Sequence, residues 1–353
     1  METLGETEGL SIVRRGATAV VTFDRPAVRN AVTVAMRRCL MQGWKRIARE
    51  PTVYAVVERS AIPGVFSVGG DLRELMALAA ADRAAVHAAV GDVSMASWLL
   101  ECFSKPTLSL YDGHVIGTGA GLSIYGTHRV AGARFRFAMP ECSIGYFVDC
   151  GLAYAFARMP HAIGPYLALT GRGIGRADAL WLGLVTHCID AEHYDAIQAS
   201  LADAEPIDPL LDARHVDPGQ GELVQTGPRI ERYFAAADVA EILARLEAAP
   251  ADDRAWADAV LADMRRASPL SLCVSHRAIR KAASLDLRGA LLNDARIACR
   301  IIVGHDIAEG VRARLVAKSH DPVWQPERVA DVTDELVESH FEPHPAEVAL
   351  PAR

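Results

Sequence analysis

Two glycine-rich segments constrain the fold of this chain more than any other feature. Val68–Asp71 follows a short apolar run and precedes an alanine-rich helical stretch from Leu72 to about Leu100. Gly117–Gly121 follows the β-branched and apolar run Thr107–Tyr111. A strand that ends in a glycine turn and leads into a helix is the repeating unit of α/β proteins. The two segments therefore predict an α/β core in which this unit occurs twice.

The N-terminal region adds a strand–helix–strand unit. Thr18–Phe23 alternates and is β-branched, and Pro26 follows it and ends the strand. Thr33 is a plausible N-cap for a helix, because the stretch that follows carries apolar residues at helical spacing. Val53–Val57 is typical of a buried strand. After the second glycine segment, the sequence from Leu122 to Tyr125 predicts the start of another helix.

The length of 353 residues fits about two domains, or one large domain with an appendage. We predict an α/β core over residues 1–204 and a linker or inserted loop over 205–228, which is rich in Pro, Asp and Gly. Residues 229–353 have an almost entirely helical pattern and predict an α-helical C-terminal part.

Composition narrows the partners and the compartment. The formal net charge of −7 argues against a nucleic-acid binder that is held by phosphate contacts. No window offers the roughly 20 apolar residues that a membrane span needs. The seven cysteines form no CxxC pair, which argues against a disulfide framework or a zinc site. The acidic N-terminus lacks a signal-peptide pattern, so we predict a soluble cytoplasmic protein with no metal.

The glycine segments have two possible interpretations, one structural and one catalytic. The structural one is a pair of tight turns that need positive φ. Gly117–Gly121 lacks the third glycine of a dinucleotide site, so a Rossmann site is not favoured. Free backbone N–H groups at two such turns could instead hold a developing oxyanion. The candidate donors are the main-chain N–H groups of Gly70 and Thr118.

A proton-transferring group is expected beside such a hole, and the segment 137–149 offers two carboxylates. Glu141 and Asp149 stand among apolar residues, where burial would raise their pKa toward neutrality and suit acid–base catalysis. Alternatively, both could cap helices or pair with arginines such as Arg158. Cys142 and Cys150 flank the two acids, but no neighbouring histidine suggests a nucleophile, and small buried residues are the favoured interpretation.

In several long motifs the sequence resembles the crotonase (enoyl-CoA hydratase/isomerase) superfamily, and within it the 3-hydroxyisobutyryl-CoA hydrolase branch. The resemblance covers nearly the whole chain. It implies an α/β fold, a crotonase-like spiral of ββα units with an α-helical C-terminal part. The matching segments are FDRPAVRNAV at 23–32, FSVGGDLREL at 66–75, KPTLSLYDGHVIGTGAGLSIYGTHRVA at 105–131, FAMPECSIGYFVDCG at 137–151, LALTG at 167–171 and HDIAEGVRARLVAKSHDPVW at 305–324.

The resemblance also implies roles for individual residues. Gly70 and Thr118 match the oxyanion-hole positions, Glu141 the catalytic carboxylate and Asp149 the second acid. It implies no cofactor, because CoA is part of the substrate. The family is often trimeric or hexameric, which is consistent with a homo-oligomer. The residues that match CoA-contacting segments are Arg25, Val28, Arg29, Ala31, Ser67, Gly69, Asp71, Leu72 and Gly117.

Several positions depart from the family pattern. Thr118 stands where the family usually has glycine, and Val148–Leu152 replaces the Pro-Asp-Val-Gly-Gly that is common in the hydrolases. The hydrolases place a glutamate on the helix before Lys105, and here Asp92 is the nearest acid. Hydratases commonly carry a first glutamate just after the second glycine loop, at the position of Gly121.

The residue that is missing at the hydratase position decides the predicted reaction. With one glutamate of the pair absent, we predict an acyl-CoA thioester hydrolase that converts 3-hydroxyisobutyryl-CoA to 3-hydroxyisobutyrate and CoA, a step of valine degradation. Glu141 would act as general base or as nucleophile. The alternatives are an enoyl-CoA hydratase or isomerase, and a catalytically silent CoA-binding protein.

Overall fold

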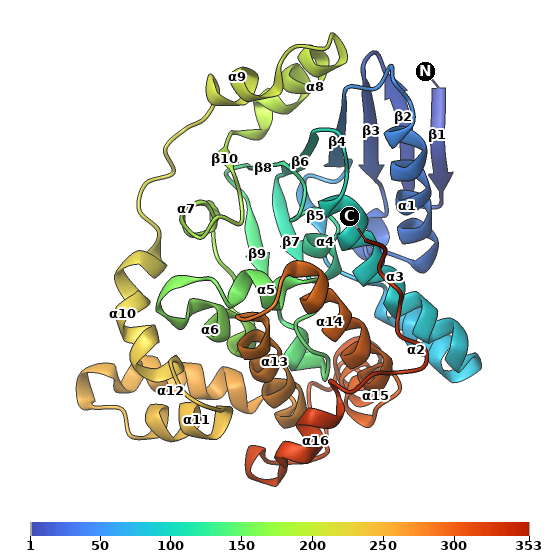
Figure 1. The fold of residues 1–353 in the computed structure, drawn as a ribbon. Helices are drawn as coiled ribbons and strands as arrows, with labels where there is room; N and C mark the ends of the chain where they lie inside the picture. The colour runs from blue at the N-terminus through green and yellow to red at the C-terminus, as the bar shows by residue number, and fades with distance from the viewer. Residues whose placement is uncertain (1, 353) are drawn as a thin grey trace.

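The computed structural model describes residues 2–352, and its strands form two sheets (Figure 1). In the described residues, the larger sheet has the order β1-β2-β3-β4-β6-β8-β10, antiparallel from β1 to β3 and parallel from there on. The smaller sheet has the order β5-β7-β9 and is parallel. The strands are β1 Glu2–Thr7, β2 Leu10–Arg15, β3 Thr18–Phe23, β4 Ala55–Ser60, β5 Gly64–Ser67, β6 Thr107–Tyr111, β7 Gly113–Ile116, β8 His128–Ala131, β9 Arg136–Ala138 and β10 His187–Cys188.

From β4 onward, successive strands alternate between the two sheets. β4, β6 and β8 lie in the larger sheet, and the strand that follows each of them lies in the smaller one. A helical segment comes after each pair, so the chain winds as a spiral of ββα units. The predicted fold class is therefore confirmed.

The three helices that the sequence predicts in the first 125 residues agree with the structure, with two exceptions. The Thr33 side chain accepts a hydrogen bond from the N–H of Met36 at 3.1 Å and caps α1 (Val34–Ala48). The stretch predicted as one helix from Leu72 is divided by Asp82, which has extended backbone angles and caps the second piece. The two pieces are α2 (Leu72–Ala81) and α3 (Arg83–Glu101).

The second exception follows the glycine loop. The predicted helix start at Leu122 is wrong, because the helical turn α4 spans Thr118–Gly121 and ends there. The turn packs closely against two other segments: a Cβ on Gly119 would lie 2.6 Å from the Ser67 Cβ, and one on Gly121 would lie 2.3 Å from the Cys150 Cβ. Glycine at these two positions therefore lets the turn lie between Ser67 and Cys150.

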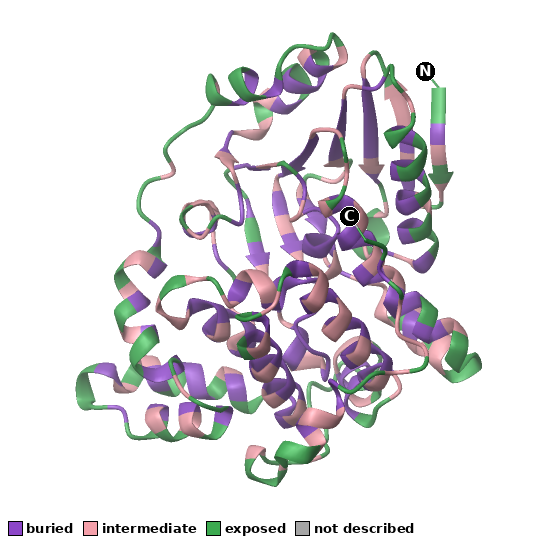
Figure 2. Cartoon of the chain, viewed as in Figure 1, coloured by how far each residue is buried: buried purple, intermediate pink, exposed green. Residues whose placement is uncertain are grey.

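The helices of the C-terminal part lie beneath the sheets and share their core. Buried residues continue from the sheets into these helices (Figure 2). The remaining α-helices in the described residues are α5 Leu152–Phe156, α6 Ile163–Thr170, α7 Arg176–Trp181, α8 Tyr194–Ala202, α9 Ile207–Asp212, α10 Glu222–Phe234, α11 Val239–Glu247, α12 Ala251–Arg265, α13 Pro269–Ala282, α14 Leu287–Ile301, α15 His305–Val311 and α16 Asp334–Ser339. The short turns are η1 Pro26–Val28, η2 Glu141–Ile144, η3 Pro160–Ala162, η4 Ala191–His193, η5 Arg312–Val316 and η6 Val329–Asp331.

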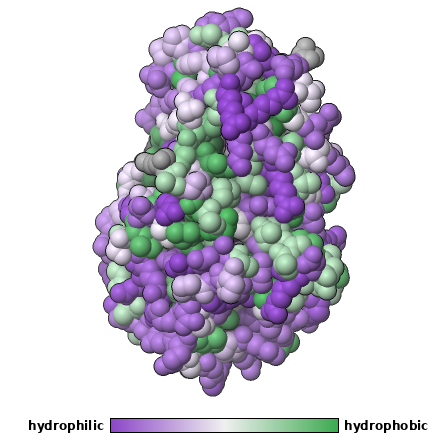
Figure 3. Space-filling model, turned by 45° about the vertical axis from the view of Figure 1, so that its right-hand side comes forward, coloured by the Kyte–Doolittle hydropathy of each residue, from purple (hydrophilic) through white to green (hydrophobic). Residues whose placement is uncertain are grey.

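Residues 205–228, predicted as a linker or inserted loop, contain α9 and the beginning of α10. The segment between these helices runs along one side of the molecule (Figure 1). The division into a core and a C-terminal part stays a prediction. Within residues 2–352 we find no helix that is long and apolar enough to cross a membrane. One face of the molecule is largely hydrophilic, with apolar surface gathered across its middle (Figure 3).

Candidate active site

The small parallel sheet brings the predicted catalytic residues together. β5 leads to Gly70, β7 leads to Thr118 and β9 leads to Glu141. The three strands pair in parallel, so their carboxyl ends meet at one edge. A cavity of about 80 Å³ lies there, lined by these three residues and by Asp149. The residues are far apart in sequence, and the sheet is the reason they meet.

Two backbone N–H groups at the cavity are free to bind a ligand. Among residues 2–352, neither the Gly70 N–H nor the Thr118 N–H donates a hydrogen bond. The neighbouring N–H groups are engaged: Gly69 donates to Ser67 Oγ at 3.2 Å, and Asp71 donates to the Val32 carbonyl at 2.9 Å. Two unsatisfied N–H groups from residues that line one cavity are the kind of donors that an oxyanion requires.

Glu141 begins the turn η2 and presents its carboxyl group to the second glycine loop. Its side chain is buried, and Oε2 has no hydrogen-bond partner. Burial raises the pKa of Glu141 well above its ordinary value, and the charge of Asp149 raises it further. A raised pKa makes the Glu141 carboxylate a stronger base than an exposed glutamate, which suits a group that transfers protons.

Gly117 has no side chain where Glu141 needs space. A Cβ on Gly117 would lie 2.6 Å from Glu141 Oε1, and its φ of 53° and ψ of −129° are rarely adopted by other residues. We expect Gly117→Ala to displace the carboxylate and lower kcat by about 10²-fold. Gly64→Ala is the control, because Gly64 also has positive φ but an added Cβ would meet nothing within 4 Å. Equal kcat losses in the two variants would contradict this explanation.

Asp149 supplies a second carboxylate to the same cavity. It is buried, and Oδ1 accepts a hydrogen bond from the Cys150 thiol at 3.1 Å. Burial raises the pKa of Asp149 to about 6, although this hydrogen bond and the charge of Arg37 oppose the rise. The carboxylate is therefore ionised at neutral pH.

Helices α13 and α14 hold the segment Val148–Gly151, which carries Asp149, through residues that the sequence analysis did not identify. Asp294, on α14, accepts a hydrogen bond from the Gly151 N–H at 2.6 Å and is itself buried. Ser275, on α13, accepts one from the Val148 N–H at 3.2 Å. The available signal for Asp294 was a lone acid within the apolar stripe that includes Leu291 and Ala298.

The alternative interpretations of the two acids and two cysteines are not supported. Arg158 donates to the carbonyls of Tyr154, Ala282 and Leu285 and pairs with neither acid. Burial raises the pKa of the Cys142 thiol to about 12 and also raises that of Cys150, so neither sulfur is an activated nucleophile.

The residues that match CoA-contacting segments fall into two groups. Gly69, Leu72 and Gly117 line the cavity. The others belong to the loop beside it, in which internal contacts hold several side chains. Arg25 Nη1 donates to Asp71 Oδ2 at 3.1 Å and to the Ala31 carbonyl at 2.5 Å. The Ser67 hydroxyl is buried and donates to the Asn30 carbonyl at 2.7 Å. Val28 and Arg29 are exposed. Their contact with CoA stays a prediction.

Sequence reasoning also missed Asn30, which fixes that loop. It is buried at a positive φ of 58°, and its Nδ2 donates to the Phe66 carbonyl at 2.9 Å. Its Oδ1 accepts from the Arg25 N–H at 2.7 Å. Asn tolerates left-handed backbone better than most residues, so an Asn within a loop was the available signal.

Neither additional glutamate position of the family carries a carboxylate into the cavity. A Cβ on Gly121 would lie 2.4 Å from the Cys150 Sγ, which leaves no room for a larger side chain. Asp92 pairs with Arg38 at 2.8 Å and does not line the cavity, whereas Val93 of the same helix does. Within the described residues that line the cavity, the carboxylates are Glu141 and Asp149.

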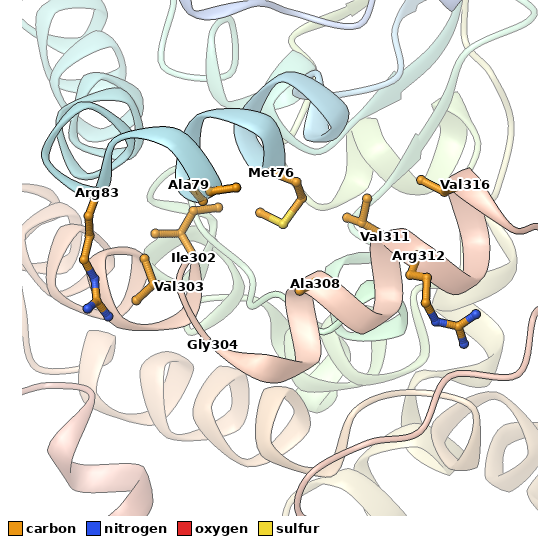
Figure 4. A pocket seen from close by; sticks show the side chains of 11 residues that line it. Met76, Ala79, Arg83, Ile302, Val303, Gly304, Ala308, Val311, Arg312 and Val316 are labelled. Carbon is orange, nitrogen blue, oxygen red and sulfur yellow. The ribbon is translucent and has the colours of Figure 1, made fainter.

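A larger and more open groove lies between α2 and the α15–η5 segment (Figure 4). Its volume is about 570 Å³, and Met76, Ala79 and Val311 point into it (Figure 4). It shares Ile302 with the cavity. Among the described residues that line it there is no carboxylate, thiol or imidazole, so it lacks the acid–base groups that line the cavity at Glu141.

Comparisons with known proteins extend over almost the whole chain. A family model described as enoyl-CoA hydratase/isomerase matches residues 18–341. The mitochondrial 3-hydroxyisobutyryl-CoA hydrolase of Rattus norvegicus is 30% identical over 346 residues, 95% of this chain and 89% of that protein. The probable 3-hydroxyisobutyryl-CoA hydrolase 2 of Arabidopsis thaliana is 32% identical, over 94% of this chain and 90% of that protein.

Two solved structures are similar in fold over a comparable length. A carnitinyl-CoA dehydratase from Mycobacterium thermoresistibile has a TM-score of 0.89 at 29% identity and covers 96% of this chain and 98% of its own. An enoyl-CoA hydratase from Rhodobacter sphaeroides 2.4.1 has a TM-score of 0.88 at 30% identity and covers 95% and 97%. These names divide between hydrolysis and hydration, so the carboxylates in the cavity must distinguish the two reactions.

Proposed function

The chain belongs to the enoyl-CoA hydratase/isomerase family, and from this premise we propose that it hydrolyses a short acyl-CoA thioester, with 3-hydroxyisobutyryl-CoA as the substrate. The observation that carries the proposal is the meeting of two unpaired backbone N–H groups and the Glu141 carboxyl group at one small cavity. The choice of the 3-hydroxyisobutyryl group rests on the names of the relatives, which are 3-hydroxyisobutyryl-CoA hydrolases.

In the proposed reaction the N–H groups of Gly70 and Thr118 bind the thioester oxygen. They stabilise the negative charge that forms on it when the carbonyl carbon is attacked. Glu141 takes a proton from the attacking water, or attacks the carbon itself to give an anhydride that water then opens. In both routes the C–S bond breaks, the thiolate leaves as CoA after taking up a proton, and the acyl group leaves as a carboxylic acid.

The cavity favours hydrolysis over hydration. Addition of water to a double bond by the two-glutamate route needs a second glutamate, and Gly121 occupies its position with Cys150 packed against it. The two structural relatives with hydratase and dehydratase names keep hydration as the second candidate. A silent CoA-binding protein is disfavoured by the two carboxylates in the cavity.

The deciding experiment measures free thiol and enoyl absorbance separately. We expect the protein to release CoA thiol from 3-hydroxyisobutyryl-CoA, and to leave the absorbance of crotonyl-CoA unchanged. Loss of crotonyl-CoA absorbance without thiol release would instead establish a hydratase. Binding of both thioesters with no turnover of either would establish the silent CoA-binding protein.

Asp149 is proposed to accept a hydrogen bond from the substrate hydroxyl group. We expect Asp149→Asn to lower kcat/KM by about 10- to 100-fold for 3-hydroxyisobutyryl-CoA, because a bond to a charged acceptor is lost. The loss should be much smaller for isobutyryl-CoA, which differs only in lacking the hydroxyl group. Thiol release from the two substrates measures this, and equal losses on both would remove the role.

Two further features stay predictions. A cytoplasmic location is predicted, although the rat relative is named as mitochondrial. A homo-oligomer is predicted from the family, and sedimentation of the purified protein would measure its mass in solution.

A further inference from the structure

Arg37 is a buried cation that the proposed reaction does not yet use. It lies on α1 with 1% of its surface exposed. Among residues 2–352, the guanidinium makes one hydrogen bond, from Nη2 to the Ala89 carbonyl at 3.2 Å, and Nε has no partner. In sequence, Arg37 lies three residues after Val34 and three before Leu40, on the apolar stripe of the helix. This position explains why it is buried, but gives no reason for its charge.

The nearby acids are engaged elsewhere and do not pair with Arg37. Asp92 accepts from Arg38 Nε at 2.8 Å, and Glu74 accepts from the Val34 N–H at 3.0 Å. Burial lowers the pKa of Arg37, while the charges of Asp92 and Glu74 oppose this. A buried charge that is neither paired nor fully hydrogen-bonded is costly, and a ligand that contacts the Arg37 guanidinium would reduce this cost.

The guanidinium faces the candidate active site. Arg37 lines the same cavity as Gly70, Glu141 and Asp149. Its Nη1 lies 3.9 Å from the position that a Cβ on Gly70 would occupy, so this end of the guanidinium lies beside Gly70. Arg37 and Asp149 attract each other electrostatically but form no ion pair in the described residues. A donor and an acceptor therefore face one small space without contacting each other.

The chemistry of this space selects the kind of group that would fill it. A hydroxyl group both accepts and donates a hydrogen bond, so it satisfies Arg37 and Asp149 together. A carboxylate would satisfy Arg37 but add a negative charge beside Glu141 and Asp149. A methyl group would offer Arg37 no hydrogen-bond acceptor and Asp149 no donor. The cavity of about 80 Å³ suits a short acyl group.

We propose that Arg37 is a specificity-determining residue that donates a hydrogen bond to the oxygen of a hydroxyl group on the acyl chain, while Asp149 accepts its hydrogen. The enzyme then selects short hydroxyacyl-CoA thioesters over unsubstituted and carboxylated ones. This inference rests on the proposed thioesterase function, and adds Arg37 as a residue that recognises the hydroxyl group of the acyl chain.

Three thioesters that differ at one carbon test the inference. In 3-hydroxyisobutyryl-CoA, isobutyryl-CoA and methylmalonyl-CoA, that carbon carries a hydroxymethyl, a methyl and a carboxylate group, respectively. We expect the wild type to prefer the first in kcat/KM. Arg37→Met should lower kcat/KM for the first by about 10- to 100-fold and for isobutyryl-CoA by less than about 3-fold. Arg38→Met is the matched control, because Arg38 is half-exposed on the same helix and pairs with Asp92. It should change neither value.

The outcomes distinguish a failure of the proposed Arg37 role from a failure of the proposed thioesterase function. Equal losses on all three thioesters in Arg37→Met would overturn the role of Arg37 while leaving hydrolysis intact. So would a wild-type preference for the methyl or carboxylate substrate, which needs no variant and holds even if Arg37→Met fails to fold. A shift of the pH–rate profile that is the same for the first two substrates would mean that Arg37 acts only through Asp149. If none of the three thioesters released thiol, the proposed function would be overturned instead.

Discussion

Glu141→Gln is expected to lower thiol release from 3-hydroxyisobutyryl-CoA by about 10³-fold. Glutamine keeps the shape and size of the side chain, but it can neither take a proton from water nor attack a carbonyl carbon. Glu141 contacts the reacting atoms in the proposed mechanism and does not hold CoA. The dissociation constant for the thioester should therefore stay close to that of the wild type. Single-turnover thiol detection and isothermal titration calorimetry measure the two quantities.

The chain offers a matched control for this substitution. Glu58 is also a buried glutamate, with its pKa raised by burial to about 7, and its Oε2 accepts from the Ser109 hydroxyl at 2.9 Å. It lies on β4, in the larger sheet, and does not line the cavity. Glu58→Gln should retain thiol release. Unchanged turnover in Glu141→Gln, or equal loss in both variants, would contradict the assignment of Glu141.

Thr118→Pro is expected to lower kcat by about 10²- to 10³-fold, because it removes one of the two N–H groups of the oxyanion hole. Proline suits this position structurally. Thr118 is the first residue of α4, where a helix tolerates proline, and the residue before it is glycine. The N–H that is lost makes no hydrogen bond in the described residues. The change therefore targets the ligand contact and spares the fold.

Thr118→Ala tests the same position without touching the backbone donor. The alanine variant should keep kcat within about 5-fold, because only the side chain near Gly70 is removed. Thermal unfolding of both variants identifies any loss that comes from misfolding. A proline variant as active as the alanine variant would show that the Thr118 N–H does not stabilise the transition state.

Local patterns predicted the elements that are set by local physics. The strand Thr18–Phe23 ended before Pro26, and Thr33 capped α1, as the sequence indicated. The break at Asp82 was missed because alanine-rich sequence on both sides has high helix propensity, and a single capping side chain divides it. The α4 turn at Thr118–Gly121 was missed because its glycines were interpreted as loop, and their packing against Ser67 and Cys150 is a tertiary contact that the sequence does not show.

The candidate site was predictable only in part, for a related reason. Gly70, Thr118 and Glu141 each follow a strand, so their order in the sequence was informative once a parallel sheet was expected. Arg37 and Asp294 lie on helices at positions within the apolar stripe, where the sequence pattern predicts core residues and not site residues. Which charged residue on a helix reaches a cavity depends on tertiary packing, and the sequence pattern alone does not contain that information.

The central claim is that Gly70 and Thr118 hold the thioester oxygen while Glu141 faces the same carbonyl group. A crystal structure of the Glu141→Gln variant with 3-hydroxyisobutyryl-CoA tests this most directly, because the substrate should persist in it. We expect the thioester oxygen at about 2.7–3.1 Å from both backbone nitrogens, with the substituted glutamine side chain beside the carbonyl carbon. A thioester oxygen bound away from both nitrogens, with that glutamine remote from the carbonyl group, would contradict it.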